Sequence, residues 1–209
     1  MPDKEGNSEI TLGVLNAVER NSRITQRDVA KHIGIALGLT NTYLKRCIKK
    51  GLIKVQQAPA NRYAYYLTPR GFAEKSRLTG EYLSQGFQFF RLTRSQLISI
   101  FENCQQRKLK KIVLHGLTDI AEIAVLCCSN YKIQIVGIVD ASSLLTEYTG
   151  IPIVSKMDDL ASFDAIIITD LGNSETTFRN LSKDFSADRI FTPRILTYSQ
   201  INHLEDANT

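Results

Sequence analysis

The positive charge of this 209-residue chain is concentrated in its first half, and this asymmetry is the strongest constraint on its fold. Residues 1–110 contain 19 lysines and arginines against 8 aspartates and glutamates, whereas residues 111–209 contain 7 against 13. Two chemically different halves indicate two domains. The basic half favours a polyanion such as nucleic acid as its partner, because neutralising phosphates releases counterions. The acidic half should not contact DNA.

The apolar spacing of the basic half predicts three helices followed by a hairpin. A first helix is expected over residues 10–21, and a second follows Thr25, a suitable N-cap, and ends at Gly34. The segment IALGL is expected to be a short turn, so the third helix opens at Thr40 and stops at Gly51. Two β-prone runs, IKVQQ and RYAYYLT, flank APAN, whose proline and asparagine favour a turn.

This order of elements predicts an α+β winged helix-turn-helix domain over residues 1–68. The second helix of such a unit enters the major groove, where its first side chains meet base edges. Lys50 and Lys54 are expected to contact phosphates, and Arg62, near the hairpin tip, phosphate or the minor groove. A three-helix bundle with a solvated basic face is the alternative. The predicted contacts to double-stranded DNA are Thr40, Asn41, Thr42, Lys45, Arg46, Lys49, Lys50 and Arg62.

A longer motif, LTPRGFAEKSRLTGEYL, follows the hairpin at residues 67–83. Together with the preceding helices and hairpin, it resembles the end of the winged domain in MarR-type regulators associated with exopolysaccharide gene clusters. The resemblance covers about residues 10–90 and implies a transcriptional regulator, with polysaccharide biosynthesis genes as its targets. It also implies that the recognition helix contains Asn41, Thr42, Lys45 and Arg46.

Residues 69–109 lack strand signals and predict a helical joining segment that begins at Pro69. Gly80, Gly86 and Thr93 are expected to break it into two or three pieces. Its apolar residues are too many for a solvated linker: Phe72, Tyr82, Leu83, Phe87, Phe90, Leu97, Ile98 and Phe101. They either pack on the chain's own domains or pair with a second subunit, as in similar regulators. We favour a homodimer, because a symmetric dimer reads two DNA half-sites.

Beyond Lys110 the pattern changes to apolar strands that alternate with helical segments. The expected strands are KIVLHG, KIQIVGIVD, DAIIITD and DRIFTPRIL, with IPIV as a short edge strand. The expected helices are DIAEIAVLCC, MDDLAS and NSETTFRNLSKDF. This alternation predicts an α/β Rossmann-like domain with a parallel sheet over residues 110–209. Ligands of such sheets bind beyond the carboxyl ends of the strands.

The turn in KIVLHGLTDIAE begins like a dinucleotide-binding loop but lacks the later glycines. Gly116 occupies the first glycine position, whereas Thr118 and Ala121 occupy the others. Thr118 and the negative charge of Asp119 disfavour tight pyrophosphate binding, while Asp140 is well placed for a ribose hydroxyl. The predicted ligand-binding residues are Gly116, Leu117, Thr118, Asp119, Asp140, Ser142, Thr169 and Asp170.

Several interpretations of this turn stay open. Its residues have either a purely structural role or hold a nucleotide-type ligand. HGLTDIAEIA, VGIVD and GIPIVSKMDDL are similar to Rossmann-like domains of bacterial sugar-modifying and polysaccharide-assembly proteins, which implies a nucleotide sugar or a dinucleotide such as NAD(H). The domain order also resembles the Rex repressors, which respond to the NADH/NAD balance, although their glycine-rich winged-helix ending and complete loop are absent. An empty oligomerisation module is the third possibility.

Catalytic residues, metal sites and membrane spans are not expected. His115, Asp119 and Asp170 are the only candidates near the predicted cleft, and His115 fits a core histidine at a strand end better than a catalyst. The cysteines show no zinc-type spacing and are expected to be buried, inert thiols, with a redox-sensing vicinal pair as the alternative; they are Cys47, Cys104, Cys127 and Cys128. With no long apolar run and no signal-peptide core, the expected location is the cytosol.

Overall fold

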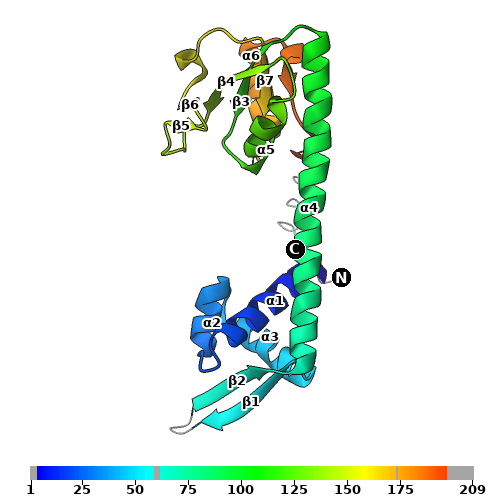
Figure 1. The fold of residues 1–209 in the computed structure, drawn as a ribbon. Helices are drawn as coiled ribbons and strands as arrows, with labels where there is room; N and C mark the ends of the chain where they lie inside the picture. The colour runs from blue at the N-terminus through cyan, green and yellow to red at the C-terminus, as the bar shows by residue number, and fades with distance from the viewer. Residues whose placement is uncertain (1–3, 59–61, 173, 197–209) are drawn as a thin grey trace. The chain divides into compact units, whose positions relative to one another are not determined.

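The chain divides into two compact units, residues 1–87 and 88–209. A computed structural model describes residues 4–58, 62–172 and 174–196 (Figure 1). The boundary between the units falls inside the joining segment, so one long helix contributes to both of them. The turn of the hairpin, with Pro59 and Asn61, lies outside the described residues.

The first unit has the predicted order of three helices and a hairpin. Its elements are α1 (Lys4–Arg20), α2 (Gln26–Ile33), α3 (Leu37–Lys49), β1 (Ile53–Ala58) and β2 (Arg62–Leu67). The strands pair antiparallel. Thr25 caps α2 by accepting a hydrogen bond from the Asp28 amide, and Gly34 ends it with a φ of 70°, as predicted. The core of this unit includes Val14, Leu15, Val18, Val29, Leu44 and Leu78.

Two helix starts were predicted wrongly in this unit. The first helix begins at Lys4, before the expected apolar run, and α3 begins at Leu37 instead of Thr40. The segment IALGL is therefore mostly helical, although Gly38 costs about 1 kcal/mol relative to alanine. Burial of Thr40 and Leu44 against the core offsets that cost. Helix propensity alone consequently placed the boundary one turn too late.

A tight junction joins the hairpin to α4 (Pro69–Gln106). The Thr68 amide donates to the Leu52 carbonyl at 3.0 Å, and the Thr68 hydroxyl donates to the Gly51 carbonyl at 2.7 Å. The same hydroxyl accepts from the Gly71 amide at 3.0 Å. A Cβ on Gly71 would lie 2.1 Å from the Leu52 carbonyl oxygen, so only glycine fits there. The TPRG part of the motif is thus a helix cap and a close backbone contact.

The joining segment is one helix, and the breaks expected at Gly80, Gly86 and Thr93 are absent from α4. Each glycine costs about 1 kcal/mol, but strong helix formers such as Glu81, Leu83 and Gln85 lie between the two glycines, and the penalty does not end the helix. Arg77 also pairs with Glu74 and Glu81 on the turns on either side. Within the described ranges, no helix is both long enough and apolar enough to span a membrane.

The second unit contains a sheet in the order β5-β6-β4-β3-β7-β8. All neighbouring strands are parallel except β5 and β6. Its elements are β3 (Lys111–His115), α5 (Asp119–Cys128), β4 (Gln134–Val139), β5 (Glu147–Tyr148), β6 (Ile151–Val154), β7 (Ala165–Ile168), α6 (Ser174–Asp184) and β8 (Ile190–Phe191). The α/β prediction with a parallel sheet is confirmed in this form.

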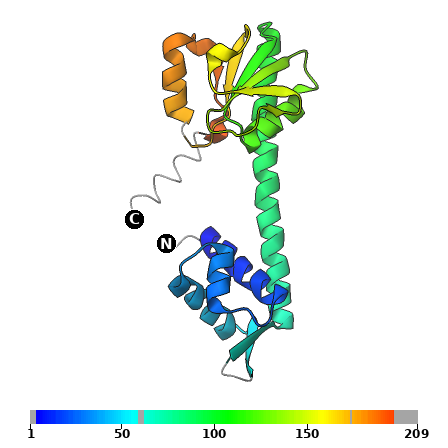
Figure 2. The same ribbon diagram turned by 90° about the vertical axis from the view of Figure 1, so that its left-hand side faces the viewer.

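Helices cover both faces of this sheet. Figure 2 shows α6, in orange, on one face and the green helices α4 and α5 on the other. Leu97, Phe101 and Cys104 of α4 are buried in the same core as the strand residues Ile112 and Ile138. Consecutive strands from β3 extend first towards β6 and then, from β7, in the opposite direction. The direction of the strand order therefore changes between β3 and β7.

Three details of the second unit differ from the sequence prediction. MDDLAS forms only the 3-10 turn Met157–Asp159, because Leu160 leaves the turn in an extended conformation and packs over Gly137. IPIV is not the edge strand, since β5 lies outside β6. The strand expected from DRIFTPRIL is only the two residues of β8. Short segments such as these take their structure from tertiary contacts and not from local sequence. A single helical turn such as that in MDDLAS, for example, is unfavourable alone.

Candidate functional site

The predicted ligand-binding residues of the second unit converge at the carboxyl ends of β3, β4 and β7. The Leu117 amide donates to Asp140 Oδ2 at 2.9 Å, and the Thr118 hydroxyl donates to the Thr169 carbonyl at 2.6 Å. The Thr169 hydroxyl bonds to the carbonyls of His115 and Gly116. Three strand ends are thereby tied into one cluster, the β3–α5 turn cluster, at the position where the strand order changes direction.

Gly116 is required by the close packing of this cluster. Its φ of 100° lies in the region that favours glycine, and an added Cβ would lie 2.9 Å from the backbone of Asp170. The hydroxyl of Thr118 accepts from the Ile120 amide and so caps α5. Both residues therefore have structural duties at the turn, and the side chain of Thr118 occupies the second glycine position as the sequence predicts.

Asp140 uses much of its hydrogen-bonding capacity within the protein. One carboxylate oxygen accepts from Leu117, and the other accepts from the amide and the hydroxyl of Ser142 at 2.9 and 2.6 Å. Burial raises the pKa of Asp140, but these hydrogen bonds outweigh it and hold the pKa below its ordinary value. The Ser143 amide also lowers the pKa of Asp140 by hydrogen bonding. A carboxylate has about four acceptor sites, so little of this capacity is left for a ligand.

The remaining predicted residues lie around this cluster. Asp119 is exposed at the first position of α5, and Ser142 is exposed beyond β4. Asp170 accepts from the Gly172 amide at 2.9 Å. Asp119, Asp140 and Asp170 together make the surface of the cluster acidic. Carboxylates accept hydrogen bonds from ligand hydroxyl groups but repel phosphates.

His115 is half-buried at the end of β3, and its Nδ1 is buried with no hydrogen-bond partner among the described residues. Burial lowers its pKa more than the nearby Asp170 and Asp140 raise it. The expected core position is confirmed, but the ring is not fully hydrogen-bonded. In the described part of the chain, no three His, Cys, Asp or Glu side chains gather into a metal-binding group.

The four cysteines are free and buried, as predicted. Burial raises the pKa of Cys47 and of Cys104 to about 11. It also raises the pKa values of the vicinal pair Cys127 and Cys128. Because the thiolate is the reactive form, these values favour inert thiols over a redox sensor.

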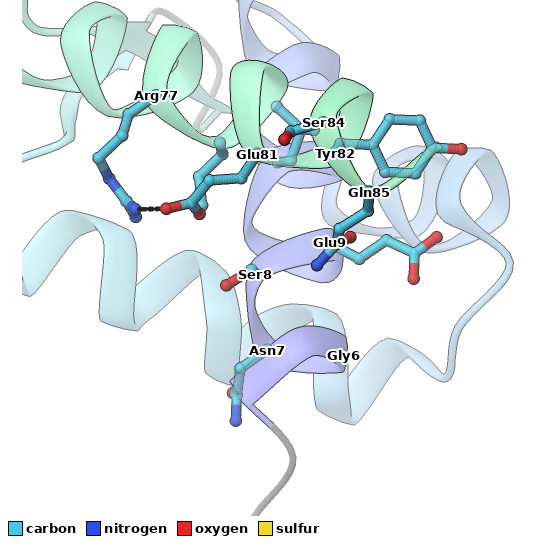
Figure 3. A pocket seen from close by; sticks show the side chains of 11 residues that line it. Gly6, Asn7, Ser8, Glu9, Arg77, Glu81, Tyr82, Ser84 and Gln85 are labelled. Atoms are coloured by element: carbon cyan, nitrogen blue, oxygen red, sulfur yellow. Dashed lines mark hydrogen bonds and ion pairs between the residues drawn. The ribbon is translucent and has the colours of Figure 1, made fainter. Parts of the chain in front are cut away.

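The first unit has a groove of about 810 Å³ between the start of α1 and residues 77–85 of α4. Figure 3 shows Glu9 of α1 facing Tyr82 and Gln85 of α4 across it. Sequence analysis missed this groove, since its two walls are far apart along the chain and carry no shared motif. Tyr82 is exposed there.

The predicted DNA-contacting residues of α3 divide into separate groups. Lys45 and Lys49 are exposed. Thr40 is fully buried, and its hydroxyl donates to the Ala36 carbonyl at 3.1 Å, so its assignment as a DNA contact is wrong. Thr40 lies on the same face of α3 as Leu44 and Cys47, which pack into the core. Asn41 is half-buried, and its Oδ1 is buried.

Arg46 and Lys50 face the first and fourth helices. Arg46 lies over the Tyr43 ring at 5.0 Å and donates to Asn7 Oδ1 at 2.8 Å. Together with Lys50 it lines a polar pocket of about 130 Å³ that also contains Glu74 and other residues of α1 and α4. Both side chains are exposed, and both line this pocket of the first unit.

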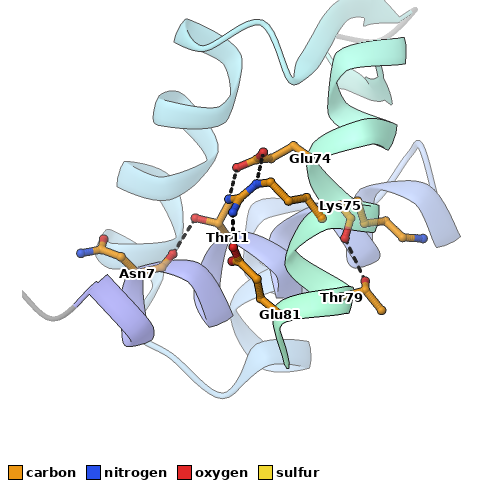
Figure 4. Close-up of polar contacts among 7 residues, drawn as sticks. Asn7, Thr11, Glu74, Lys75, Thr79 and Glu81 are labelled. Carbon is orange, nitrogen blue, oxygen red and sulfur yellow. Dashed lines mark hydrogen bonds and ion pairs between the residues drawn. The ribbon is translucent and has the colours of Figure 1, made fainter. Parts of the chain in front are cut away.

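The wall of this pocket is held by further polar contacts. Figure 4 shows the Thr11 hydroxyl donating to the Asn7 carbonyl. Glu74 and Glu81 both form ion pairs with the guanidinium of Arg77. Hydrogen bonding to Arg77 lowers the pKa of Glu74 despite some burial. Because these ion pairs are exposed, they contribute little to stability and mainly orient the side chains.

Comparison with protein families gives a match in the basic unit. Residues 7–54 match winged helix-turn-helix DNA-binding domains. This match covers α2 and α3, which occupy the two helix positions of a helix-turn-helix. Comparison with curated proteins gives no match.

Parts of several solved structures are similar to the chain. A PcaV transcriptional regulator from Streptomyces coelicolor is 21% identical over 47% of this chain and 74% of its own, with a TM-score of 0.39. The Staphylococcus aureus MepR–DNA complex gives 23% identity, 39% and 59% coverage, and a TM-score of 0.34. A Mycobacterium tuberculosis MarR family protein, in complex with p-aminosalicylic acid, is 18% identical over 34% of this chain and 55% of its own, with a TM-score of 0.31. The chain spans less than two thirds of the last two.

The wing of this winged helix-turn-helix presents aromatic and basic side chains. Lys54 pairs across the strands with Tyr66, and both are exposed. Tyr63 is exposed as well. The β2 strand begins at Arg62, whose side chain lies outside the described residues. Sequence analysis missed the two tyrosines, and strand alternation does not identify them, because it places Tyr63 on the same face as the buried Tyr65.

Proposed function

We propose that this protein is a transcriptional regulator of the MarR type that binds double-stranded DNA as a homodimer and is not an enzyme. The observation that carries the proposal is a winged helix-turn-helix whose recognition helix exposes Lys45 and Lys49. The motif at residues 67–83 supports target genes in polysaccharide biosynthesis. Lys54 of the wing is exposed as well and is proposed to contact phosphate.

DNA binding is tested by titrating a labelled duplex at several salt concentrations. Each phosphate contact adds about 0.9 to the slope of log affinity against log salt. A Lys45→Ala/Lys49→Ala variant removes four such contacts from a homodimer, so it should lower the slope by about 3.6. A Lys132→Ala/Lys156→Ala variant, which removes two exposed lysines from the acidic unit, is the control. An equal slope in all three proteins would contradict the proposed surface.

The dimer is proposed to form along α4. Leu83, Phe90, Leu97 and Cys104 recur every seven residues, so they lie along one face of the helix. Leu97 and Cys104 are fully buried in the α/β core, whereas Leu83 is 52% exposed and Phe90 39%. The apolar face therefore continues beyond its own partner surface, and Phe87, 60% exposed, widens it. A second α4 would cover these side chains.

Sedimentation equilibrium tests the dimer. A Leu83→Glu/Phe87→Glu variant should sediment as a monomer, because an interface cannot bury unpaired carboxylates without a cost of several kcal/mol. Gln88→Glu places one charge on an exposed neighbouring position and should leave the dimer intact. If the double variant keeps the mass of the unsubstituted protein, the interface lies elsewhere.

We further propose that the α/β unit is Rossmann-like and binds a nucleotide-type ligand at the β3–α5 turn cluster. The support is the convergence of Gly116, Thr118, Asp140 and Asp170 where the strand order changes direction. The acidic surface of the cluster favours a ribose or sugar hydroxyl close to Asp140, with the phosphates farther from the three aspartates. Such a ligand would regulate DNA binding only if it bound two arrangements of the dimer with different affinity.

A thermal-shift series with NAD, NADH and UDP-sugars tests this second proposal, since a ligand that binds only the folded state raises the melting temperature. A shift with UDP-sugars supports the polysaccharide assignment, and a shift with NADH supports redox sensing of the Rex kind. Unchanged melting with all of them would contradict the ligand proposal and indicate an oligomerisation module.

A further inference from the structure

The first turn of the recognition helix α3 presents apolar side chains to solvent. Leu37 is 42% exposed and Leu39 is 43% exposed, and they flank Gly38, beside which an added Cβ would meet nothing within 4 Å. Single exposed leucines are common on protein surfaces and have no meaning by themselves. Their position matters here, because the first residues of a recognition helix are those that meet base edges.

The polar side chains next to these leucines are poorly available to a duplex. The Thr42 hydroxyl donates to the Gly38 carbonyl at 3.0 Å, and Asn41 is half-buried with its Oδ1 buried. Direct reading of bases by hydrogen bonds needs free, well-oriented donors and acceptors at the groove floor. The structure gives this part of α3 few of them.

The charges nearby fit the backbone of a duplex and not its bases. Lys45 and Lys49 follow the first turn along α3 and are exposed. Lysine acts largely as a point charge, which suits phosphate better than the directed pairs that distinguish bases. Charge complementarity therefore commits this surface to duplex DNA, and the apolar first turn is left to contact the groove floor.

In the major groove, the apolar feature of a base edge is the C5 methyl group of thymine. We propose that Leu37 and Leu39 are specificity-determining residues that recognise thymine methyl groups in each operator half-site. Lys45 and Lys49 hold the helix on the phosphates, and sequence is read mainly by apolar contact. This inference rests on the proposed DNA-binding function.

The test compares two duplexes that differ only in methyl groups. An operator is selected from a random-sequence duplex pool with the full-length protein, and a second copy is made with deoxyuridine in place of thymidine. Base pairing and charge are the same in both. Burying one methyl-sized group contributes about 0.8 kcal/mol, so affinity should fall about fourfold for each contacted thymine. Substitution restricted to the flanks of the footprint should leave affinity unchanged.

A Leu37→Ala/Leu39→Ala variant separates methyl contact from effects of deoxyuridine on duplex shape. The variant should bind the thymidine duplex more weakly and show no further loss on the deoxyuridine duplex. Leu39→Met, which keeps an apolar side chain, should retain the sensitivity to deoxyuridine. If the double variant is not folded by circular dichroism, the single Leu39→Ala variant and the unsubstituted protein still decide the matter.

The outcomes distinguish this inference from the proposed function. Failure to enrich any duplex from the pool would overturn the DNA-binding proposal itself. Equal affinity of the unsubstituted protein for both duplexes would overturn the thymine inference while leaving DNA binding intact. A deoxyuridine effect that persists undiminished in the leucine variants would also overturn it, because the loss would then come from duplex deformability.

Discussion

The helix α3 and the β3–α5 turn cluster use their polar residues in different ways. In the cluster, Thr118 and Asp140 bond to the backbone of other segments and hold three strand ends together. On α3, Lys45 and Lys49 are exposed, and the Thr42 hydroxyl bonds only within its own helix. Removing a side chain should therefore reduce folding stability in the cluster and DNA affinity on α3.

The largest expected difference comes from matched glycine substitutions. Gly116→Ala forces a Cβ to within 2.9 Å of the Asp170 backbone at a φ of 100°, and should reduce the free energy of unfolding by about 3 kcal/mol. Gly38→Ala has open space in α3 and should increase it by up to about 1 kcal/mol. Urea denaturation followed by circular dichroism measures both. Equal effects would remove the distinction between the two regions.

Threonine substitutions should give an intermediate difference. Thr118→Ala removes the cap of α5 and the bond to the Thr169 carbonyl, which should cost about 1–2 kcal/mol of unfolding free energy, whereas Thr118→Ser should recover most of it. Thr42→Ala should leave stability unchanged, since alanine favours helix and the lost bond is local. Thermal melts of the three variants make the comparison, and a loss on Thr42→Ala as large as on Thr118→Ala would contradict it.

The smallest predicted effect is a pH dependence in the cluster. The pKa of Asp140 is lowered in the folded protein, so its contribution to stability is present above the unfolded-state pKa of about 4 and is lost as pH falls through the folded value. The stability difference between the unsubstituted protein and Asp140→Asn should be constant above about pH 5 and shrink below about pH 4. Ser142→Ala, which removes one of the donors, should reduce the difference.

Long apolar patterns explain which parts of the fold were predictable. The α5 helix occupies the predicted DIAEIAVLCC, and β3 and β7 follow the apolar runs closely, because burial of a continuous apolar segment dominates local preferences. The cap at Thr25 and the left-handed Gly34 were also predictable from local chemistry. By contrast, Gly80 and Gly86 favoured breaks that α4 does not have.

The use of each polar side chain was less predictable than its position. The convergence of Gly116, Asp140 and Thr169 followed from the parallel sheet, since carboxyl ends of neighbouring strands meet at one edge. The engagement of Arg46 by Asn7 was not accessible, because the partner comes from a helix distant in sequence. Thr40 was assigned to the wrong side of α3, although it precedes Leu44 by four residues and Cys47 by seven and therefore shares their buried face.

The junction of Leu52, Thr68 and Gly71 has a consequence for the half-site spacing that a dimer can bind. The base of the wing and the opening turn of α4 share hydrogen bonds and leave no room for even a methyl group between them, so they move as one piece. In a dimer joined along α4, any rotation of that helix carries the attached wing by the same angle. The distance between the two half-sites that such a dimer accepts then reports directly on the geometry of its interface.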